Sequence, residues 1–357
     1  MLRQTRCRNI TMKNETCVSE PAYSINMGIK HLNKYIVDQC KPGVRTMQFS
    51  ELRNKTVVVD ISIYLYKFQM SESLVENMYI MLTLFEQNGI HPIFIFDGKA
   101  PAEKRELLNK RYHERMKAES QYGELCDQLQ HMEDNANDTQ RQQLTCKMQT
   151  LKRKMVYLHK TDVAIIQSMI DHFGFSFFYS ATEADKLCHM FVKYGIAWAC
   201  MSEDMDMFVY GIPRILRYMS LYSQTCVLYD THRILQELHM EHHTLVNICI
   251  LSGTDYNPAI RGATIHRLFD LFREYRALGD SRCFMEWLRS EKFHYTAEEY
   301  EKVGQVKEIF TREESEDVRV IARYCDTVFQ RRYKRQGDIR SILEKSNFVY
   351  PLAIQSH

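Results

Sequence analysis

The sequence predicts an α/β fold in which a mainly parallel, twisted sheet is flanked by helices, with a helical insertion and a helical C-terminal region. Two observations lead to this prediction. Apolar runs rich in β-branched and aromatic residues alternate with segments whose apolar residues recur at helical spacing, as in a parallel sheet. Between residues 100 and 160 no strand-like run occurs, although the polar segment keeps a helical periodicity.

The first strand-helix-strand unit lies between residues 56 and 97. The run Thr56–Val59 ends in Asp60, and the run HPIFIF ends in Asp97, so each predicted buried strand delivers an Asp at its carboxyl end. Between them, apolar residues from 74 to 85 recur at helical spacing, and Gly89 is a suitable C-cap. We therefore expect the strands on either side of this helix to be parallel.

Further strands follow in the second half of the chain. The runs FSFFYS, IAWACMS, ILRYM and TCVLYD have the composition of strands, and amphipathic helices are expected at 161–173 and 183–194. After about residue 240 the pattern is mostly helical. The sheet is therefore expected to be largely parallel and covered by helices.

The strand-free segment from about 100 to 160 is predicted to be a helical insertion. Its thirteen Lys and Arg, counted from Lys99 to Lys160, lie at its two ends. Its middle is acidic, with Glu124, Asp127, Glu133, Asp134 and Asp138. A solvated helical hairpin would account for this charge pattern, and basic ends would also suit a phosphate backbone.

The sequence divides into three regions. Residues 1–26 show no periodicity and are expected to be a disordered leader, residues 27–240 form an α/β domain with the insertion, and residues 241–357 form a helical region. The last region carries a basic tail with Arg331, Arg332, Lys334 and Arg335. We expect the tail to be polar and solvated.

Composition restricts the class of protein and its location. The 47 Lys and Arg nearly balance the 45 Asp and Glu, giving a net charge of +2, so no bulk positive charge marks a nucleic-acid binder. The 11 Cys form no C-x-x-C pairs, which favours reduced thiols in an intracellular protein. No apolar run is long enough for a membrane span. We expect a soluble protein of the nucleus or cytoplasm, while the Arg-rich start MLRQTRCRNITMK weakly resembles a mitochondrial presequence.

Acidic residues stand where a parallel sheet would bring them together. They fall at strand ends or helix starts, and ligands of open α/β sheets bind beyond the carboxyl ends of the strands. Taken singly, each acid could be a helix cap, whereas two tight pairs and three strand-end acids together indicate a site. Glu203 is expected to lie outside it. The seven acids are Asp60, Asp97, Glu183, Asp185, Asp204, Asp206 and Asp255.

Clustered carboxylates need cations. Oxygen ligands without His or Cys partners favour Mg²⁺ or Mn²⁺ over Zn²⁺. Two such ions about 4 Å apart can activate water and stabilise the leaving oxygen of an in-line phosphoryl displacement. The sequence thus predicts two Mg²⁺ ions per site, with Mn²⁺ able to substitute, and hydrolysis of phosphodiesters.

At this point the chain resembles the flap endonuclease family, the XPG-like 5′ nucleases with a PIN-like fold, from Met27 to about Gly262. Six segments carry the resemblance in the family's order: MGI, VVVDISIYLYKF, IFIFDGKAPAEKRELLNKR, ATEADKLC, SEDMDMFVYG and ICILSGTDYNPAIRG. The resemblance implies that the seven acids bind two divalent ions. It also makes the insertion at 100–160 the arch through which the family passes a free 5′ end.

The resemblance assigns further roles. Lys104 and Arg111 match a basic pair that steadies the scissile phosphate in catalysis and contacts DNA, although two solvated charges would look the same. Tyr66 matches an aromatic residue that stacks on a base, where a core Tyr is the alternative. Gly28 matches the small residue at which the chain's start approaches the DNA, where a capping Gly is the alternative.

A second DNA contact is implied near GTDYNPAIRG, which resembles the start of a helix-turn-helix element that grips duplex backbone, with Arg261 and Gly262 as contacts. The segment departs from the family at two positions. Ala259 replaces a hydroxyl residue and Thr264 replaces a Gly, which puts potassium binding and a strong duplex grip in doubt. We also expect no sliding-clamp motif, since the chain ends in NFVYPLAIQSH, and the 26 residues before Met27 depart from the family's usual start.

The function implied by the resemblance is a structure-specific 5′ flap endonuclease or 5′–3′ exonuclease acting on branched or 5′-ended DNA in replication, repair or recombination, alongside other proteins of those processes. Similar short, divergent versions occur in large DNA viruses. Three alternatives remain open: a 5′–3′ exoribonuclease with the same site, a non-catalytic scaffold that binds DNA structures, and a phosphatase-like hydrolase. The presence of all seven acids argues against the scaffold, and the long insertion argues against the phosphatase.

Overall fold

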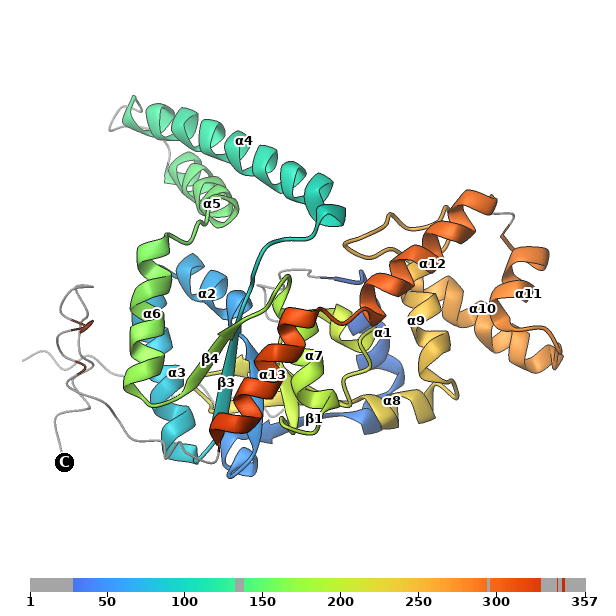
Figure 1. Ribbon diagram of the computed structural model, residues 1–357. Coiled ribbons are helices and arrows are strands. Elements are labelled where there is room, and N and C mark those ends of the chain that lie inside the picture. Colours follow the sequence, from blue (N-terminus) through green and yellow to red (C-terminus); the bar gives the residue numbers. More distant parts are fainter. Residues whose placement is uncertain (1–27, 132–137, 294–295, 329–338, 340–341, 344–357) are drawn as a thin grey trace, which may run out of the picture.

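The computed structural model describes residues 28–131, 138–293, 296–328, 339 and 342–343 (Figure 1). The predicted leader, the basic tail and the acidic residues Glu133 and Asp134 of the insertion lie outside these residues. In the part that is described, no helix is both long and apolar enough to cross a membrane.

A single seven-stranded sheet forms the centre of the protein, in the order β1-β7-β6-β5-β2-β3-β4. Neighbours from β6 to β4 are parallel, which confirms the predicted mainly parallel sheet. The strands are β1 (Val44–Gln48), β2 (Thr56–Asp60), β3 (His91–Phe96), β4 (Ser176–Tyr179), β5 (Ala199–Met201), β6 (Arg214–Ser220) and β7 (Thr225–Asp230).

One edge of the sheet is antiparallel, and one of its strands was not anticipated from the sequence. Strand β7 runs antiparallel to both β6 and β1. In β1, with the sequence VRTMQ, only Met47 is buried. Because four of its five side chains are at least partly solvated, β1 lacks the apolar run that revealed the other strands.

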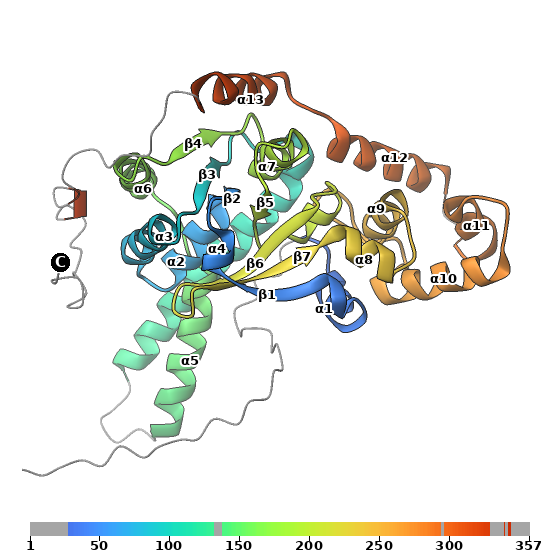
Figure 2. The same ribbon diagram turned by 90° about the horizontal axis from the view of Figure 1, so that it is seen from below.

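Helices cover both faces of the sheet (Figure 2). The helix at residues 74–88 ends at Gly89 in the left-handed conformation, as expected for a C-cap, with a φ of 67°. The long helices before residue 240 are α1 (Leu32–Gln39), α2 (Ile61–Met70), α3 (Leu74–Asn88), α4 (Arg105–Gln130), α5 (Asp138–Lys154), α6 (Lys160–His172), α7 (Ala184–Lys193) and α8 (Thr231–Glu237). Short 3₁₀ helices are η1 (Lys41–Gly43), η2 (Phe49–Leu52), η3 (Ala102–Lys104) and η4 (Met205–Phe208).

Two buried apolar cores, one on each face, hold the layers together. Helices α2, α3 and α6 pack on one face around residues such as Phe85 and Phe94, both fully buried. Helices α1 and α7 pack on the other face, around residues such as Phe191 and Ile215. Burying both faces fixes the register of the strands, and hence the edge at which their carboxyl ends meet.

The insertion predicted at 100–160 forms two helices, α4 and α5, that lie against each other and rise from the carboxyl end of β3 (Figure 1). Both helices are polar, and Ala118 is the only buried side chain in α4. The helices therefore project from the body instead of contributing to its cores.

The region after residue 240 is helical, as expected, but it does not remain apart from the sheet. It comprises α9 (His242–Leu251), α10 (Ile265–Leu278), α11 (Phe284–Glu291), α12 (Ala297–Thr311) and α13 (Ser315–Val328). Helices α9 and α12 pack together, whereas α13 returns to α7 beside β4 (Figures 1 and 2). Helix α13 thus packs against α7, in the helical layer on that face of the sheet.

Candidate active site

The sheet brings the predicted acids to one edge. Asp60 is the last residue of β2, Asp97 follows β3, and Asp204 and Asp206 follow β5, which pairs with β2. Glu183 and Asp185 lie at the start of α7, after β4. Asp255 reaches the same edge from the loop after α9. Because β2, β3, β4 and β5 are parallel, all these carboxyls lie beyond their carboxyl ends.

Asp60 and Asp204 are linked through a serine. Ser202 Oγ, directly after β5, donates a hydrogen bond to Asp60 Oδ2 (3.1 Å) and accepts one from the Asp204 amide (3.1 Å). The Asp204 carboxylate caps helix η4 by accepting from the Asp206 amide (2.8 Å). Asp206 Oδ1 is buried and has no hydrogen-bond partner. This oxygen is therefore available to a cation.

Gly28 lies against this group of acids. Its φ is +70°, and a Cβ added at this position would lie 2.3 Å from Asp204 Oδ1 and 2.5 Å from Asp206 Oδ1. A side chain would therefore have to displace the carboxylates, and the positive φ disfavours one in any case. Glycine at this position places the backbone at the edge of the site.

A second group of acids surrounds the Lys104 ammonium. Lys104 Nζ lies 2.5 Å from Glu183 Oε1 and 3.5 Å from Asp255 Oδ2, and 4.8 Å from the centre of the Tyr256 ring. The Tyr256 hydroxyl donates to the other Glu183 oxygen. Arg111, seven residues further along the chain in α4, places Nη2 3.3 Å from Asp255 Oδ2. The predicted basic pair thus lies among the predicted acids.

The remaining two acids complete the arrangement. Asp97 Oδ1 accepts a hydrogen bond from the Ala184 amide at the start of α7 (2.9 Å). This bond ties the end of β3 to the helix that carries Glu183 and Asp185. Burial raises the pKa of Asp185 well above its usual range, and the nearby Asp204 and Asp60 carboxylates raise it further.

Repulsion and burial shape the electrostatics of the whole group. Burial raises the pKa of Asp60, as do Asp97 and Asp204, and burial followed by the Asp204 charge raises the pKa of Asp206. Burial lowers the pKa of Lys104, but the charges of Glu183, Asp185 and Asp255 outweigh it, so the net pKa of Lys104 is raised. The site therefore favours cations strongly.

Across the described residues, no three His, Cys, Asp or Glu side chains are arranged as ligands of one ion. Several of the carboxylates contact other groups: Asp60 accepts from Ser202, and Asp97 and Asp204 accept from backbone amides. Glu183 and Asp255 lie against Lys104. The seven acids share an edge of the sheet without sharing one coordination centre.

An aromatic and basic surface lies at the base of α4, next to the acids. The Arg115 guanidinium lies between the rings of Tyr112 (5.5 Å) and Tyr157 (5.2 Å), both about half exposed. Tyr66, on α2, is 43% exposed. Partial burial and then the charge of Asp97 raise its pKa, whereas the charge of Arg115 lowers it. Tyr66 is thus at the surface near the site and is not a core residue.

The predicted second DNA contact is a tight turn between α9 and α10. Gly262 has a φ of +81° and its carbonyl accepts from Arg267 Nη1 (3.2 Å), while Arg261 is exposed. Thr264, which departs from the family's Gly, caps α10 by accepting from the Arg267 amide (3.4 Å). Ala259 packs beside Gly253, whose φ is +96°. The departures at Ala259 and Thr264 are therefore compatible with a well-formed turn.

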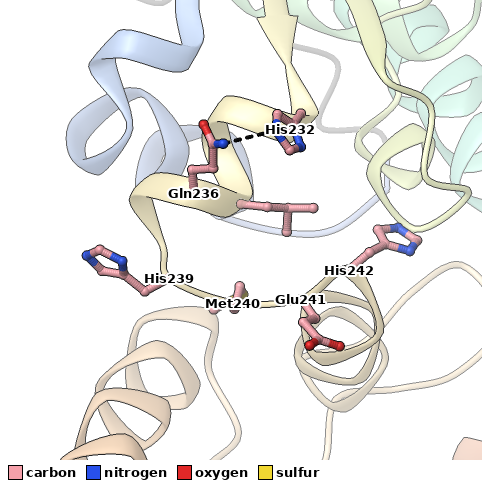
Figure 3. Close-up of a pocket in the computed structure, with 7 residues that line it drawn as sticks. His232, Gln236, His239, Met240, Glu241 and His242 are labelled. Carbon is pink, nitrogen blue, oxygen red and sulfur yellow. Dashed lines mark hydrogen bonds between the residues drawn. The ribbon is translucent and has the colours of Figure 1, made fainter.

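A separate cavity of about 660 Å³ lies between α8 and α9 (Figure 3). Three of its lining residues are histidines, but they do not converge: His232 faces Gln236 (2.9 Å), His242 Nε2 donates to the Phe208 carbonyl (2.8 Å), and His239 points away. None of the predicted site residues lines it. The acid edge, not this cavity, is the candidate active site.

Two functional contacts were missed in the sequence. Ser202 lies two residues before Asp204 and Tyr256 directly follows Asp255, so both belong to recognised motifs. Their hydrogen bonds to Asp60 and Glu183 become visible only in the structure. Glu203 turns away as expected: its Oε1 accepts from the Tyr218 amide (2.9 Å) and its carbonyl accepts from Arg217 (2.8 Å).

Two family models match this chain. The XPG N-terminal domain matches residues 27–118, and the XPG I-region matches residues 174–255. Among curated proteins, flap endonuclease 1 of Ovis aries is 27% identical over 270 residues, covering 71% of this chain and 67% of its own length. Flap endonuclease 1 of Brugia malayi is 28% identical over 271 residues, covering 71% and 68%.

Solved structures share the fold. The catalytic core of Rad2 in complex with DNA substrate superposes with a TM-score of 0.54 at 17% identity, covering 86% of this chain and 93% of its own. Human GEN1 in complex with Holliday junction DNA gives a TM-score of 0.56 at 14% identity, covering 90% and 74%. The two matched regions carry all seven acids together with Lys104 and Arg111. The chain thus contains both the N-terminal domain and the I-region of XPG-type nucleases, and it is similar to flap endonucleases over 71% of its length.

Proposed function

We propose that this protein is a metal-dependent, structure-specific 5′ nuclease that cuts DNA near the junction of a 5′ flap. The observation that carries the proposal is the meeting of seven acids with Lys104 and Arg111 at the carboxyl edge of the sheet, below the projecting helices α4 and α5. The similarity to flap endonucleases and to the XPG-type regions supports the reaction class. The relatives' names and the DNA in the Rad2 and GEN1 structures supply the substrate class.

The residues present fit divalent cations. The available ligands are carboxylate oxygens, which suit Mg²⁺ or Mn²⁺, and Asp206 Oδ1 is buried without a hydrogen-bond partner. Two ions held here would supply the charge that activates water for attack on phosphorus and stabilises the leaving oxygen. The ligands we propose are Asp60, Asp97, Glu183, Asp185, Asp204, Asp206 and Asp255.

Lys104 and Arg111 have a second role once cations neutralise the acids. Their contacts with Glu183 and Asp255 compensate negative charge that bound cations would compensate instead. Both groups would then be free to hold the scissile phosphate and to offset the charge that develops in the transition state. Lys104 is 8% exposed, so its donors are fixed in position and poorly solvated.

The surface around α4 offers contacts to the strand being cut. Tyr66, Tyr112 and Tyr157 present exposed rings next to Arg115, and stacking of unpaired bases on such rings is largely independent of sequence. The turn at Arg261 and Gly262 would contact duplex backbone. Together these surfaces would distinguish a junction of single and double strand from plain duplex.

The first prediction concerns metal binding. In metal-free buffer, Asp206→Asn should raise the melting temperature by about 2 °C or more, because it removes one of several mutually repelling buried charges. The folded-state pKa of Asp206 is raised, so its ionised form destabilises the fold increasingly as pH rises, and the gain should be larger at about pH 8.5 than at about pH 5.5. Thermal unfolding with and without Mg²⁺ measures both effects.

In Asp206→Asn the additional stabilisation by Mg²⁺ should also shrink, because one ligand is lost. The control is Asp38→Asn on the exposed side of α1, which should change neither quantity. A full Mg²⁺ response in Asp206→Asn would remove this residue from the ligand set.

The second prediction concerns the reaction itself. Wild type should cut end-labelled 5′-flap DNA near its junction in Mg²⁺, and both EDTA and Asp204→Ala should abolish cutting, whereas Asp38→Ala should not. Nicked duplex and single-stranded RNA are tested alongside. A preference for RNA or for plain ends would contradict the flap specificity. Binding without any cleavage would instead indicate a scaffold.

The third prediction separates catalysis from binding. Lys104→Ala should lower the single-turnover rate by about 100-fold, since it removes a charge that acts in the transition state, while changing the Kd for flap DNA much less. Lys110→Ala, an exposed lysine two turns further along the same segment, is the control. Equal losses in rate and affinity would make Lys104 a simple phosphate contact.

The fourth prediction concerns the unpaired strand. Tyr157→Ala and Tyr112→Ala should each weaken binding of flap DNA by roughly tenfold, because stacking contributes about 1–3 kcal/mol per base. Binding of fully paired duplex should be unchanged. The control is Tyr222→Ala, a fully exposed tyrosine in the turn between β6 and β7. Equal weakening on paired duplex would show that these rings do not recognise unpaired bases.

A further inference from the structure

A buried carboxylate from the C-terminal helix reaches the loop that leads into the acid edge. Asp317, in the first turn of α13, is 0% exposed. Its Oδ1 accepts a hydrogen bond from the Ala181 amide (2.8 Å), and both of its oxygens lie 3.2 Å from Ser180 Oγ, which donates to them. A helix 136 residues away in the chain thus satisfies the polar groups of this loop.

The loop held by Asp317 leads directly into one proposed metal ligand, Glu183, and is hydrogen-bonded to the segment that follows another, Asp97. It runs from Ser180 to Thr182, immediately before Glu183 at the start of α7. It is also bonded to the residues after Asp97: the Gly98 amide donates to the Thr182 carbonyl (2.7 Å) and the Lys99 amide to the Ala181 carbonyl (3.4 Å). A displacement of this loop would therefore move the ends of both β3 and β4.

The two loops are in close contact at Gly98. A Cβ added at Gly98 would lie 2.0 Å from the Ser180 carbonyl oxygen and 2.8 Å from that of Ala181. Beyond Gly98, Asp97 Oδ1 accepts from the Ala184 amide. Asp97, Glu183 and the loop between them thus form one hydrogen-bonded unit, and Asp317 is its contact with the C-terminal region.

Further contacts anchor α13 where Asp317 can act. Just before the helix, Glu313 pairs with Lys193 at the far end of α7 (2.5 Å) and accepts from the Tyr194 hydroxyl (3.2 Å). Later in the helix, Tyr324 packs edge-on against Phe178 (5.8 Å) and Phe191 (5.3 Å). The first turn of α13 is therefore fixed from both sides.

We propose that Asp317 is a positioning residue for the nuclease site: it holds the loop at Ser180 and Ala181 and thereby sets the positions of Asp97 and Glu183. This inference rests on the proposed function, in which both acids hold divalent cations. Removing a residue that orients a metal ligand through a hydrogen bond typically lowers metal affinity or activity by about 10–100-fold. The C-terminal helix would then be part of the catalytic unit.

Three full-length variants test the proposal. Asp317→Ala removes the contact, Asp317→Asn keeps an acceptor for the Ala181 amide, and Glu316→Ala removes an exposed acid from the same helical turn. The Mg²⁺ dependence of single-turnover flap cleavage, Mg²⁺ binding by titration calorimetry, and the Kd for flap DNA are measured for each. A merely stabilising residue would leave the first two quantities unchanged in folded protein.

In Asp317→Ala we expect the Mg²⁺ concentration for half-maximal cleavage to rise about tenfold and the calorimetric Mg²⁺ affinity to fall to match, with the DNA Kd within about twofold of wild type. Asp317→Asn should recover most of the loss, and Glu316→Ala should behave as wild type. Wild-type Mg²⁺ dependence and affinity in folded Asp317→Ala would overturn the proposal.

If Asp317→Ala does not fold, Ser180→Ala decides the question, because it removes one contact on the loop side and leaves α13 intact. It should shift the Mg²⁺ dependence in the same direction by a smaller factor, and no shift would overturn the proposal. Wild type that binds Mg²⁺ but cuts no nucleic acid would refute the proposed function alone, and the calorimetric comparison would still test Asp317.

Discussion

Mutual repulsion among carboxylates at one edge of the sheet is the constraint on which the rest of the structure depends. Parallel strands and buried cores fix where the edge lies, and the acids are held together although burial and neighbouring charge raise the pKa of Asp60, Asp185, Asp204 and Asp206. Such an arrangement lowers stability unless positive charge compensates it. Under the proposed function, the same repulsion would favour the binding of divalent cations.

Two kinds of compensation are built into the chain. Lys104 and Arg111 bring fixed positive charge from α4, and Ser202 together with backbone amides satisfies individual oxygens. Neither removes the negative charge entirely, and Asp206 Oδ1 remains without a hydrogen bond. Under the proposed function, this unsatisfied oxygen would be a ligand for a divalent cation, and Lys104 would contact the phosphate.

Much of the fold followed from the sequence because its signals were local. Strands β2 and β3 are continuous apolar runs, α3 has helical spacing with Gly89 as its cap, and the acids follow the strands directly. Strand β1 was missed because its edge position leaves most of its side chains solvated. The contact between Lys104 and Glu183 was not predicted, because the resemblance assigned Lys104 only to the scissile phosphate and 79 positions separate the two residues.

The contact between Asp317 and the loop at Ser180 shows why some of the site could not be predicted. In sequence, Asp317 is one of several acids at the start of a polar helix, where an Asp normally stabilises the helix end and stays solvated. Asp317 is buried because α13 packs back against α7. Contacts of the Tyr324 ring with Phe178 and Phe191 stabilise this position of the helix. A residue's role at such a position is set by tertiary contacts. The boundary predicted at residue 241 therefore divides the sequence but not the candidate site. Residues after this boundary, such as Asp255 and Asp317, contact residues of the site that come before it.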